Sequence, residues 1–329
     1  MHYEYIFYIK KEKMSNKQPQ VYFYVPYADV LQVREDEEKY TYANGIVSRR
    51  KFLKSPLNYI GGKYKLLPQL IEFFPEKINT FVDLFSGGFN VGINVDCNKV
   101  ICNDMNTFII DLYKELYSKP IDETLNKITG RINEYGLSKE NEEAFKKFRD
   151  YYNKTKEPID LYTLSCYSFN YQFRFNNKEY NNPFGRNRSQ FSDNMKSNLI
   201  LFTEKLKSMN VEFLSEPFDK VDLSKLNNED FVYCDPPYLI TTGSYNDGNR
   251  GFKDWKEEEE IQLYKVLDEL NKRKVKFALS NVIEHKGKEN ILLKEWSKKY
   301  KTIYLTSDYS NSSYNTKRDK SIEVLIINY

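Results

Sequence analysis

Histidine and paired cysteines are the features that this chain has least of. Its 329 residues include only two histidines, His2 and His285, which lie far apart in the sequence. Ser-His-Asp or Cys-His hydrolysis would have to rest on His285 alone, so histidine catalysis is disfavoured. No C-x-x-C pair is present, which argues against a zinc site of ordinary spacing and against a secreted disulfide framework. The four cysteines are Cys97, Cys102, Cys166 and Cys234.

Long apolar runs are also missing. No stretch approaches the roughly 18 to 20 consecutive apolar residues that a membrane helix needs. The first residues, MHYEYIFYIKKEKM, carry an acid and lysines where a signal peptide needs a clean apolar stretch. With 40% hydrophobic residues the chain can bury a core. We therefore expect a cytoplasmic protein that does not bind membranes.

The charge balance is nearly even, with a net charge of +3 and a pI near 8.3. Net charge alone therefore does not indicate a polyanionic partner. The 28 tyrosines, 22 phenylalanines and 50 basic residues do offer stacking faces and phosphate donors for a nucleic acid. An AT-rich genome, which favours Lys, Asn, Ile, Tyr and Phe throughout, explains the same composition.

Apolar strands alternate with helical segments after a polar, tyrosine-rich stretch at residues 1–50, which we interpret as an N-terminal extension. The alternation implies parallel crossovers and a doubly wound α/β sheet. The last two strands have no helix between them and predict an antiparallel edge hairpin. The predicted strands are TFVDLF, KVICND, VEFLSE, DFVYCD, KVKFALSNV, KTIYLT and SIEVLIINY.

A different pattern interrupts this alternation. Residues 107–165 have helical spacing, and the aromatic and polar residues that follow alternate around an Asn-Asn-Lys turn, which predicts a β-hairpin. Basic residues outnumber acids five to two between Tyr171 and Asn198. We therefore predict an inserted helical and hairpin domain at 113–206, within a sheet domain formed by 51–112 and 207–329.

A glycine turn comes after the first predicted strand, in VDLFSGGFN. Such a turn at the carboxyl end of a strand lets a ligand approach the backbone, at the edge of an open α/β sheet where ligands bind. Gly87 and Gly88 by themselves are also consistent with a simple tight turn. Asp104 ends the next strand, about 17 residues after Gly87, where nucleoside-binding sheets carry the acid that binds ribose.

The segment FVYCDPPYLI ends a buried strand on an acid and two prolines. The prolines fix φ and remove two N–H donors, so the chain leaves the sheet as a stiff, extended corner. The Asp235 carboxylate and the Pro236 carbonyl then remain as two outward acceptors, with Pro237 stiffening the corner. This pair suits a substrate NH2 group, and Tyr238 offers a flat face to the ring that carries the amine.

Together these motifs resemble the Dam-like (D12 class, alpha-group) DNA adenine N6-methyltransferases. The resemblance covers about residues 55 to 329, with cofactor motifs first, a recognition insert next and Asp-Pro-Pro-Tyr last, which is the order of that family. It implies a Rossmann-like methyltransferase sheet with an inserted DNA-recognition domain, S-adenosylmethionine (SAM) as cofactor and double-stranded DNA as partner. The motifs that carry it are NYIGGKYKLL, FVDLFSGG, NNPFGR, YCDPPY and ALSN.

The resemblance also implies roles for individual residues. Phe89 stands where the family often has a second spaced glycine, and Pro217 stands where an acid is common, so the adenine end of the cofactor is the least defined part. The implied cofactor residues are Tyr59 and Lys63, then Asp83, Phe85 and Gly87 at the methionine end, Asp104 at the ribose, Phe218 on the adenine, and Asp235, which is shared with the catalytic corner.

In the implied mechanism, Asp235 and the Pro236 carbonyl draw adenine N6 toward a pyramidal geometry, and methyl transfer depends on proximity more than on a strong base. Tyr238 stacks on the target adenine, which must leave the duplex. The implied catalytic residues are Asp235, Pro236, Pro237 and Tyr238. The candidate DNA-binding residues are Arg174, Asn176, Lys178, Asn182, Arg186 and Arg188.

Other interpretations remain open at the level of sequence. The same acceptor pair would hold a cytosine amine for N4-methylation, and a DNA-binding subunit without activity is a further alternative. The hairpin residues are also compatible with a solvated loop of incidental charge. A nicotinamide dehydrogenase is disfavoured because the chain has no G-x-G-x-x-G. We expect a monomer or weak dimer, with a cognate restriction endonuclease as a candidate partner.

Overall fold

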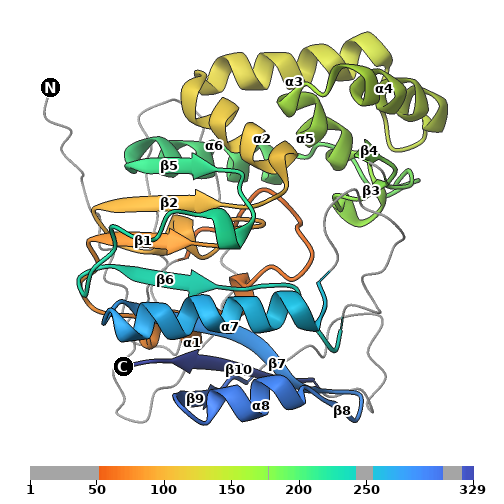
Figure 1. The fold of residues 1–329 in the computed structure, drawn as a ribbon. Helices are drawn as coiled ribbons and strands as arrows, with labels where there is room; N and C mark the ends of the chain where they lie inside the picture. The colour runs from red at the N-terminus through yellow and green to blue at the C-terminus, as the bar shows by residue number, and fades with distance from the viewer. Residues whose placement is uncertain (1–51, 177, 242–254, 307–320) are drawn as a thin grey trace, which may run out of the picture. The chain divides into compact units, whose positions relative to one another are not determined.

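A computed structural model describes residues 52–176, 178–241, 255–306 and 321–329 (Figure 1). Contacts between residues divide the chain into two units, Met1–Arg50 and Lys51–Tyr329, and every described residue belongs to the second unit. The extension predicted at residues 1–50 lies outside the described residues. No helix in the described part is both long enough and apolar enough to cross a lipid bilayer.

The second unit is built on one large mixed sheet. Its strands are β1 (Thr80–Asp83), β2 (Lys99–Asn103), β5 (Val211–Leu214), β6 (Phe231–Cys234), β7 (Lys276–His285), β8 (Lys288–Glu289), β9 (Lys301–Tyr304) and β10 (Ser321–Ile327). Over the described ranges these eight strands have the order β5–β2–β1–β6–β7–β10–β9, with β8 paired to the end of β7. The first five strands in this order are parallel to one another.

The final strand, β10, runs antiparallel to both of its neighbours, β7 and β9. Leu325, for example, pairs with Ser280 of β7 on one side and with Ile303 of β9 on the other. The predicted α/β sheet, mostly parallel with an antiparallel strand pair, is therefore confirmed. Because β10 lies between β7 and β9, one edge of the described sheet is β9, and the other edge is β5.

Helices cover both faces of the sheet because strand side chains alternate between two hydrophobic cores. On β1, Phe81 belongs to one core and Val82 to the other. The first core includes α1 (Leu67–Glu72), α2 (Thr107–Ser118) and α6 (Asp193–Ser208), and the second includes α7 (Glu257–Lys272) and α8 (Ile291–Ser297). In Figure 1, α7 crosses in front of the sheet and α1 lies behind it.

A helical segment and a short hairpin lie between α2 and α6 in the chain. They comprise α3 (Ile121–Tyr135), α4 (Glu142–Thr155), α5 (Pro158–Cys166), β3 (Phe175–Asn176) and β4 (Glu179–Tyr180). The predicted helices and hairpin are thus present. Residues 159–166 are all buried, and the hydrophobic residues among them join the same core as the sheet residues Phe81 and Val100. In the described chain this segment therefore shares its hydrophobic core with the sheet, and its role as a recognition domain stays a proposal.

Ordinary local signals set the ends of these helices. The Asn106 side chain accepts the Phe108 N–H (3.2 Å) and begins α2, and Pro158 is the first residue of α5. Gly136 adopts a left-handed conformation (φ +66°) and ends α3. The helices α2 to α5 run from Thr107 to Cys166, close to the range of 107–165 that the helical spacing predicts.

Candidate active site

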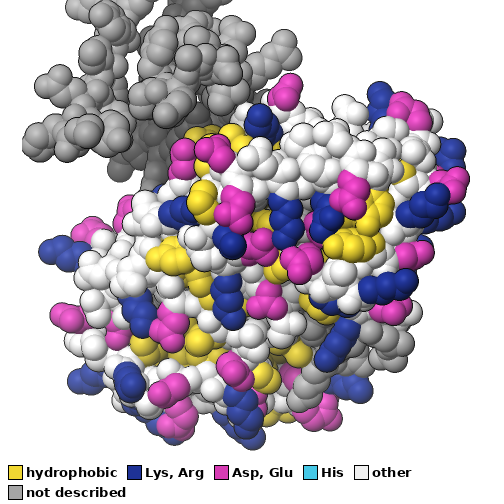
Figure 2. All heavy atoms as spheres, turned by 90° about the horizontal axis from the view of Figure 1, so that it is seen from above, with side chains coloured by type: hydrophobic (Ala, Val, Ile, Leu, Met, Phe, Trp, Pro, Cys, Tyr) yellow, Lys and Arg dark blue, Asp and Glu magenta, His cyan; other side chains and the backbone are white. Residues whose placement is uncertain are grey.

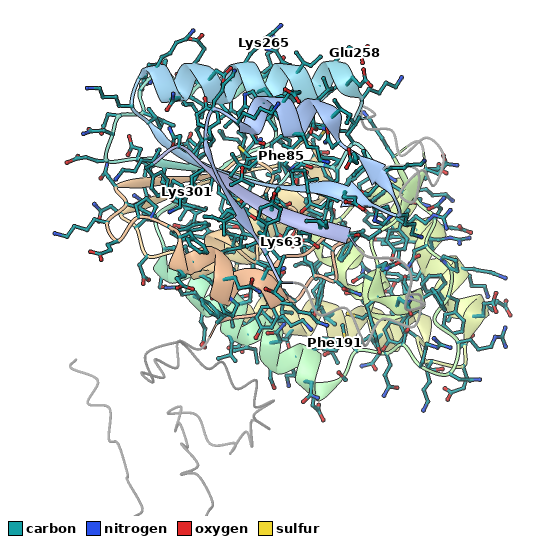
Figure 3. All side chains as sticks on the ribbon, turned by 90° about the horizontal axis from the view of Figure 1, so that it is seen from below. Lys63, Phe85, Phe191, Glu258, Lys265 and Lys301 are labelled. Carbon is teal, nitrogen blue, oxygen red and sulfur yellow. The ribbon has the colours of Figure 1, made fainter. Side chains whose placement is uncertain are left out.

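A cavity of about 800 Å³ lies at the carboxyl ends of β1, β2 and β6. This volume is within the range of sites for small molecules. The cavity brings together three distant stretches of chain: residues 59–63, the glycine turn with Asp104, and the corner at 235–238. Figure 3 shows Lys63 and Phe85 in the interior, whereas Glu258 and Lys265 mark α7 near the outer edge.

The Asp235 carboxylate is held by two neighbours. Lys63 Nζ lies 2.8 Å from Oδ2 and is itself buried, with 6% of the lysine side chain exposed. The Tyr238 hydroxyl donates to Oδ1 at 2.9 Å, and Lys63 Nζ lies 5.0 Å from the centre of the Tyr238 ring. Burial raises the pKa of Asp235, while Lys63 and then the Tyr238 hydroxyl oppose that shift. The corner therefore presents a carboxylate in a fixed orientation at the cavity wall.

The glycine turn allows a close approach between backbone and side chains. Gly87 has a φ of +46°, and a Cβ there would come within 3.0 Å of the Tyr59 ring. The Gly87 N–H donates to Asp104 Oδ2 (2.8 Å), and the Asn106 N–H donates to Oδ1 (2.8 Å). Asp104 therefore fixes the turn and the start of α2, and the unused lone pairs of its carboxylate are available to a ligand. Burial raises its pKa, against the two backbone hydrogen bonds.

Asp83 ends β1 beneath the cavity and is 1% exposed. Its Oδ2 accepts the Gly92 N–H at 3.1 Å. Burial raises the pKa of Asp83 to about 8; the Gly92 hydrogen bond lowers it, and the nearby carboxylates of Asp235 and Asp104 raise it further. Three acids therefore share one region, and a positively charged ligand there would favour the ionised form of each.

The other end of the cavity is aromatic. The ring centroids of Phe85, Phe218 and Trp255 lie 5.5 to 5.6 Å from one another. All three residues line the cavity, and Pro217 lines it beside Phe218. Aromatic faces grouped in this way suit a flat heterocycle. This end of the cavity is thus formed with a proline at position 217.

Every cofactor and catalytic residue predicted from the sequence lines this one cavity. These residues are Tyr59, Lys63, Asp83, Phe85, Gly87, Asp104, Phe218, Asp235, Pro236, Pro237 and Tyr238. Several other lining residues were not predicted, because a local motif does not show which of its side chains face a cavity. Among them are Asn90, Asn103, Glu216, Trp255 and Gln262.

Most of the candidate DNA-binding residues lie on the surface of the hairpin region. Asn176 and Lys178 are exposed at the β3–β4 turn, and Arg174 is partly buried. Arg186 and Arg188 are exposed as well; Arg186 pairs with Glu142 of α4, and the Arg188 guanidinium lies 5.4 Å from the centre of the Phe169 ring. On the face drawn in Figure 2, basic and acidic side chains are interspersed, without an extended patch of one sign.

The expectation that Asn182 faces DNA is wrong. Its side chain is 2% exposed, and its Nδ2 donates to the carbonyls of Phe169 (3.0 Å) and Gln172 (2.9 Å). Asn182 therefore satisfies backbone groups inside the hairpin region. The alternation of polar and aromatic residues in the sequence did not reveal which polar side chains point inward.

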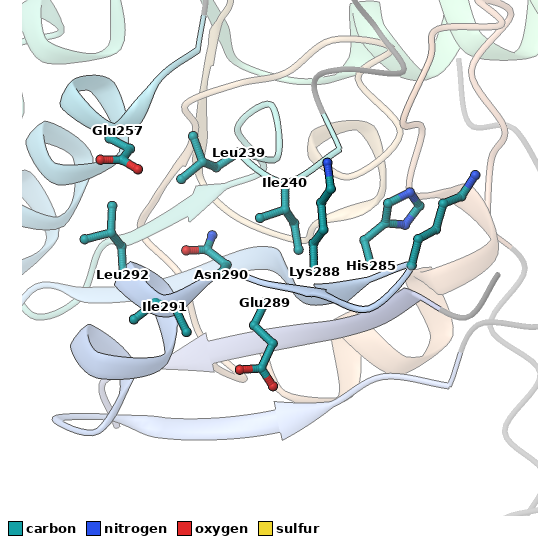
Figure 4. A pocket seen from close by; sticks show the side chains of 10 residues that line it. Leu239, Ile240, Glu257, His285, Lys288, Glu289, Asn290, Ile291 and Leu292 are labelled. Carbon is teal, nitrogen blue, oxygen red and sulfur yellow. The ribbon is translucent and has the colours of Figure 1, made fainter.

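A second cavity, of about 680 Å³, shares no lining residue with the first (Figure 4). It lies beside Leu239 and Ile240, which come directly after the corner, and beside the β7–β8 hairpin, which carries His285, Lys286 and Lys288. His285 Nδ1 lies 2.6 Å from Ser321 Oγ. The histidine thus lies away from the first cavity.

The fold and the cavity define an α/β protein with a ligand site at the carboxyl ends of parallel strands. Residues 59–311 match the family model of the D12 class N6 adenine-specific DNA methyltransferases, and the chain belongs to this family. It is 62% identical over 279 residues to the type II methyltransferase M.FokI of Planomicrobium okeanokoites, a match that covers 84% of this chain and 43% of that protein.

Two further relatives mark the breadth of the family. The modification methylase StsI of Streptococcus sanguinis is 55% identical over 287 residues, which cover 86% of this chain and 44% of that protein. The DNA adenine methylase of Escherichia coli is 28% identical over 285 residues, which cover 84% of this chain and 95% of that protein. The chain thus spans less than half the length of M.FokI and of StsI.

Proposed function

We propose that this protein is a site-specific DNA adenine N6-methyltransferase that uses SAM and acts on an adenine turned out of duplex DNA. The observation that carries this proposal is the single cavity that joins the Asp235–Tyr238 corner to the glycine turn and Asp104. A methyl donor and an amine acceptor must meet within one site, and this cavity has a suitable wall for each. Membership of the D12 class family supports the same activity.

The residues of the cavity fit SAM in three ways. The group of Phe85, Phe218 and Trp255 suits its adenine ring, and Asp104 suits its ribose hydroxyls. The acidic region around Asp83 suits a positively charged ligand. When bound, SAM supplies a methyl group on a cationic sulfur that leaves as a neutral thioether.

The chain's own contribution is to orient the amine. Asp235 and the carbonyl of Pro236 accept the two protons of the adenine NH2, so the nitrogen lone pair turns toward the methyl group. Lys63, 2.8 Å from Asp235, supports the carboxylate charge and keeps it an acceptor. As the C–N bond forms, the nitrogen becomes positive and then releases one proton to water, so Asp235 needs no strongly basic character.

The base must leave the helix stack to reach this corner, at a cost of a few kcal/mol. Stacking on Tyr238 and contacts to phosphates compensate for that cost. We propose residues 113–206 as the recognition domain, with Asn176 and Lys178 at its exposed turn and with Arg174, Arg186 and Arg188 nearby. Asn182 is left out of this set because it is buried.

The relatives named as type II methyltransferase and modification methylase suggest the biological setting. We propose that methylation by this chain protects DNA from a cognate restriction endonuclease. The cytoplasmic location and the monomeric or weakly dimeric state remain expectations from the sequence.

The test is transfer of labelled methyl from SAM into duplex DNA, followed by nucleoside analysis. The expected product is N6-methyladenine. Asp235→Ala should lower kcat at least about a hundredfold, the scale for removing one preorganised hydrogen-bonding group. Asp222→Ala is the matched control, because Asp222 is exposed and lines neither of the two cavities.

Two outcomes would reject the proposal. N4-methylcytosine as product would move the protein to the alternative chemistry with the same corner. Full activity in Asp235→Ala would show that the Asp235 carboxylate does not orient the amine. SAM binding by the variant, measured in parallel, separates a defect in chemistry from a loss of the fold.

A further inference from the structure

The carboxylate of Glu260 lies in the first turn of α7 and is 0% exposed. It does not line the large cavity, although its neighbours in the chain do: Trp255, Lys256, Glu258 and Glu259 all line it. A carboxylate is rarely buried without a specific set of partners, because removing its charge from water is costly. Its partners therefore indicate its role.

Four neutral donors surround this carboxylate. Oε1 accepts from the Tyr264 hydroxyl (2.6 Å), from Asn281 Nδ2 (3.0 Å) and from Asn290 Nδ2 (3.2 Å). Oε2 accepts from Trp255 Nε1 at 2.6 Å. An ionised carboxylate has about four acceptor sites, so this set of donors nearly saturates it. The bond from Trp255 is the one that reaches the wall of the cavity.

The donor set requires a side chain that only accepts. A glutamine at position 260 has one oxygen and one NH2 group. If its oxygen faced Trp255, its NH2 would face the other three donors, and in the opposite orientation its NH2 would face the indole N–H. Either arrangement leaves buried donors unpaired, which is destabilising.

Trp255 is the point where this network meets the site. Its ring lies 5.6 Å from that of Phe85, at 82° between planes, and 5.5 Å from that of Phe218. The residue stands just before α7, whose first turn is closed by Glu259 accepting the Lys256 N–H (3.0 Å). The hydrogen bond from Trp255 to Glu260 therefore restrains the indole of Trp255, which lies outside the helix.

We propose that Glu260 is a positioning residue for the cofactor: through its hydrogen bond to Trp255 it holds the indole against Phe85 and Phe218 and so keeps the aromatic end of the cavity preformed. This inference rests on the proposed function, since the ligand that benefits is the adenine of SAM. A preformed slot lowers the ordering cost of binding. Loss of Glu260 should therefore weaken SAM binding more than it slows methyl transfer at saturation.

The alternative is a purely structural role, in which Glu260 only ties α7 to β7 and to Asn290, which caps α8. Tyr264→Phe tests that alternative. It removes another donor to the same carboxylate and leaves the bond to Trp255 in place. A purely structural role predicts that Glu260→Gln and Tyr264→Phe affect the binding of SAM equally. A positioning role predicts that loss of the hydrogen bond to Trp255 weakens the binding of SAM, whereas loss of the Tyr264 hydroxyl does not.

The experiment is a double-mutant cycle on the dissociation constant for SAM, with Glu260→Gln, Trp255→Phe and the double variant. We expect each single change to raise Kd at least about fivefold, and the double variant to be no worse than the weaker-binding single, because coupled residues are not additive. Tyr264→Phe should lower Tm and leave Kd within about twofold. The kcat at saturating SAM should change less than Kd in the Glu260→Gln protein.

A second readout does not depend on SAM. The chain has two tryptophans, Trp255 and Trp296, so Trp296→Phe leaves the indole of Trp255 as the only one. In that background Glu260→Gln should shift the emission to longer wavelength and lower its anisotropy. If Glu260→Gln does not fold, the Kd values of Trp255→Phe and Tyr264→Phe are compared instead. We expect Trp255→Phe to raise Kd and Tyr264→Phe to leave it nearly unchanged.

The inference fails if Glu260→Gln binds SAM like the parent, if the two single effects multiply in the double variant, or if Tyr264→Phe raises Kd equally. Failure of the unmodified protein to bind SAM is a different result. It would reject the proposed function, while the emission of Trp255 would still show whether Glu260 restrains the indole.

Discussion

Phe89 shows how one residue can depart from a family pattern and still fit. It adopts a positive φ of 55°, the region that favours glycine, and it is fully buried. Its ring fills the space over Gly92, where an added Cβ would come within 2.2 Å of a ring carbon. The strain of about 1 to 2 kcal/mol is similar in size to the gain of about 1.5 to 3 kcal/mol from burying a phenylalanine side chain. The sequence shows that Phe89 stands where the family often has a glycine, but only the backbone conformation shows how a phenylalanine fits there.

Asp83 gives a prediction of pH dependence at the same scale. Burial raises its pKa from 3.8 to about 8 in the folded protein, whereas in the unfolded chain it should titrate near its ordinary value. The folded state therefore binds more protons between these values, so the stability that Asp83 contributes is complete below about pH 4 and is lost as the pH rises toward about 8.

Asp83→Asn keeps an acceptor for the Gly92 N–H and removes the titration. Without SAM, the Tm of the variant should fall less than that of the parent between pH 5 and about pH 8. Asp104 and Asp235 remain in the variant, and their raised pKa values leave part of the slope in place. Parallel Tm curves for the two proteins would contradict the assignment.

At the scale of elements, the proposed contribution of the β3–β4 hairpin to DNA binding can be tested. Lys178 is exposed in its turn with a φ of +66°. Lys178→Ala should weaken binding to all duplexes to a similar degree and should reduce the slope of log affinity against log salt by about one, as expected for one lost phosphate contact.

Lys298→Ala is the control for that measurement, because Lys298 is also an exposed lysine but lies at the end of α8, outside the hairpin. Its side chain pairs with Glu295. Binding titrations at several salt concentrations would compare the two variants. An unchanged salt slope in Lys178→Ala would remove the hairpin turn from the proposed interface.

The elements also show what the sequence can and cannot predict. Apolar runs, helical spacing and turn residues predicted the order of strands and helices, because those signals are local. The four glutamates at 257–260 predict only a favourable interaction with the helix dipole. The structure separates them: Glu259 caps α7 and Glu260 is buried under Trp255. Burial of two of these four acids, Glu260 completely, depends on contacts with distant segments, which no local pattern contains.

At the scale of the molecule, the predicted boundary between sheet domain and insert does not coincide with a break in the core. Phe81 and Val100 of the sheet share one hydrophobic cluster with Phe148 of α4 and Leu161 of α5. The motifs around the cavity could be predicted because each is rigid and short. The shared core could not, because it depends on how α2, α5 and α6 pack together.

One cooperative unfolding transition should therefore include both parts. Tryptophan emission reports on the region of α7 and α8, and far-ultraviolet circular dichroism reports mainly on the helices, including α3 to α5. We expect the two signals to give the same midpoint in a urea titration. Midpoints that differ would show that the helical segment unfolds separately.

The position of β10 has a consequence for the order in which the protein is made. β9 leaves the ribosome before β10, yet in the described sheet it pairs only with β10. Until residues 321–327 are synthesised, β9 has no ladder to join and β7 presents an open edge to other nascent chains. Completing this part of the sheet therefore requires the insertion of β10 between two strands that have already been made, and the unpaired edges favour association with other chains until β10 covers them.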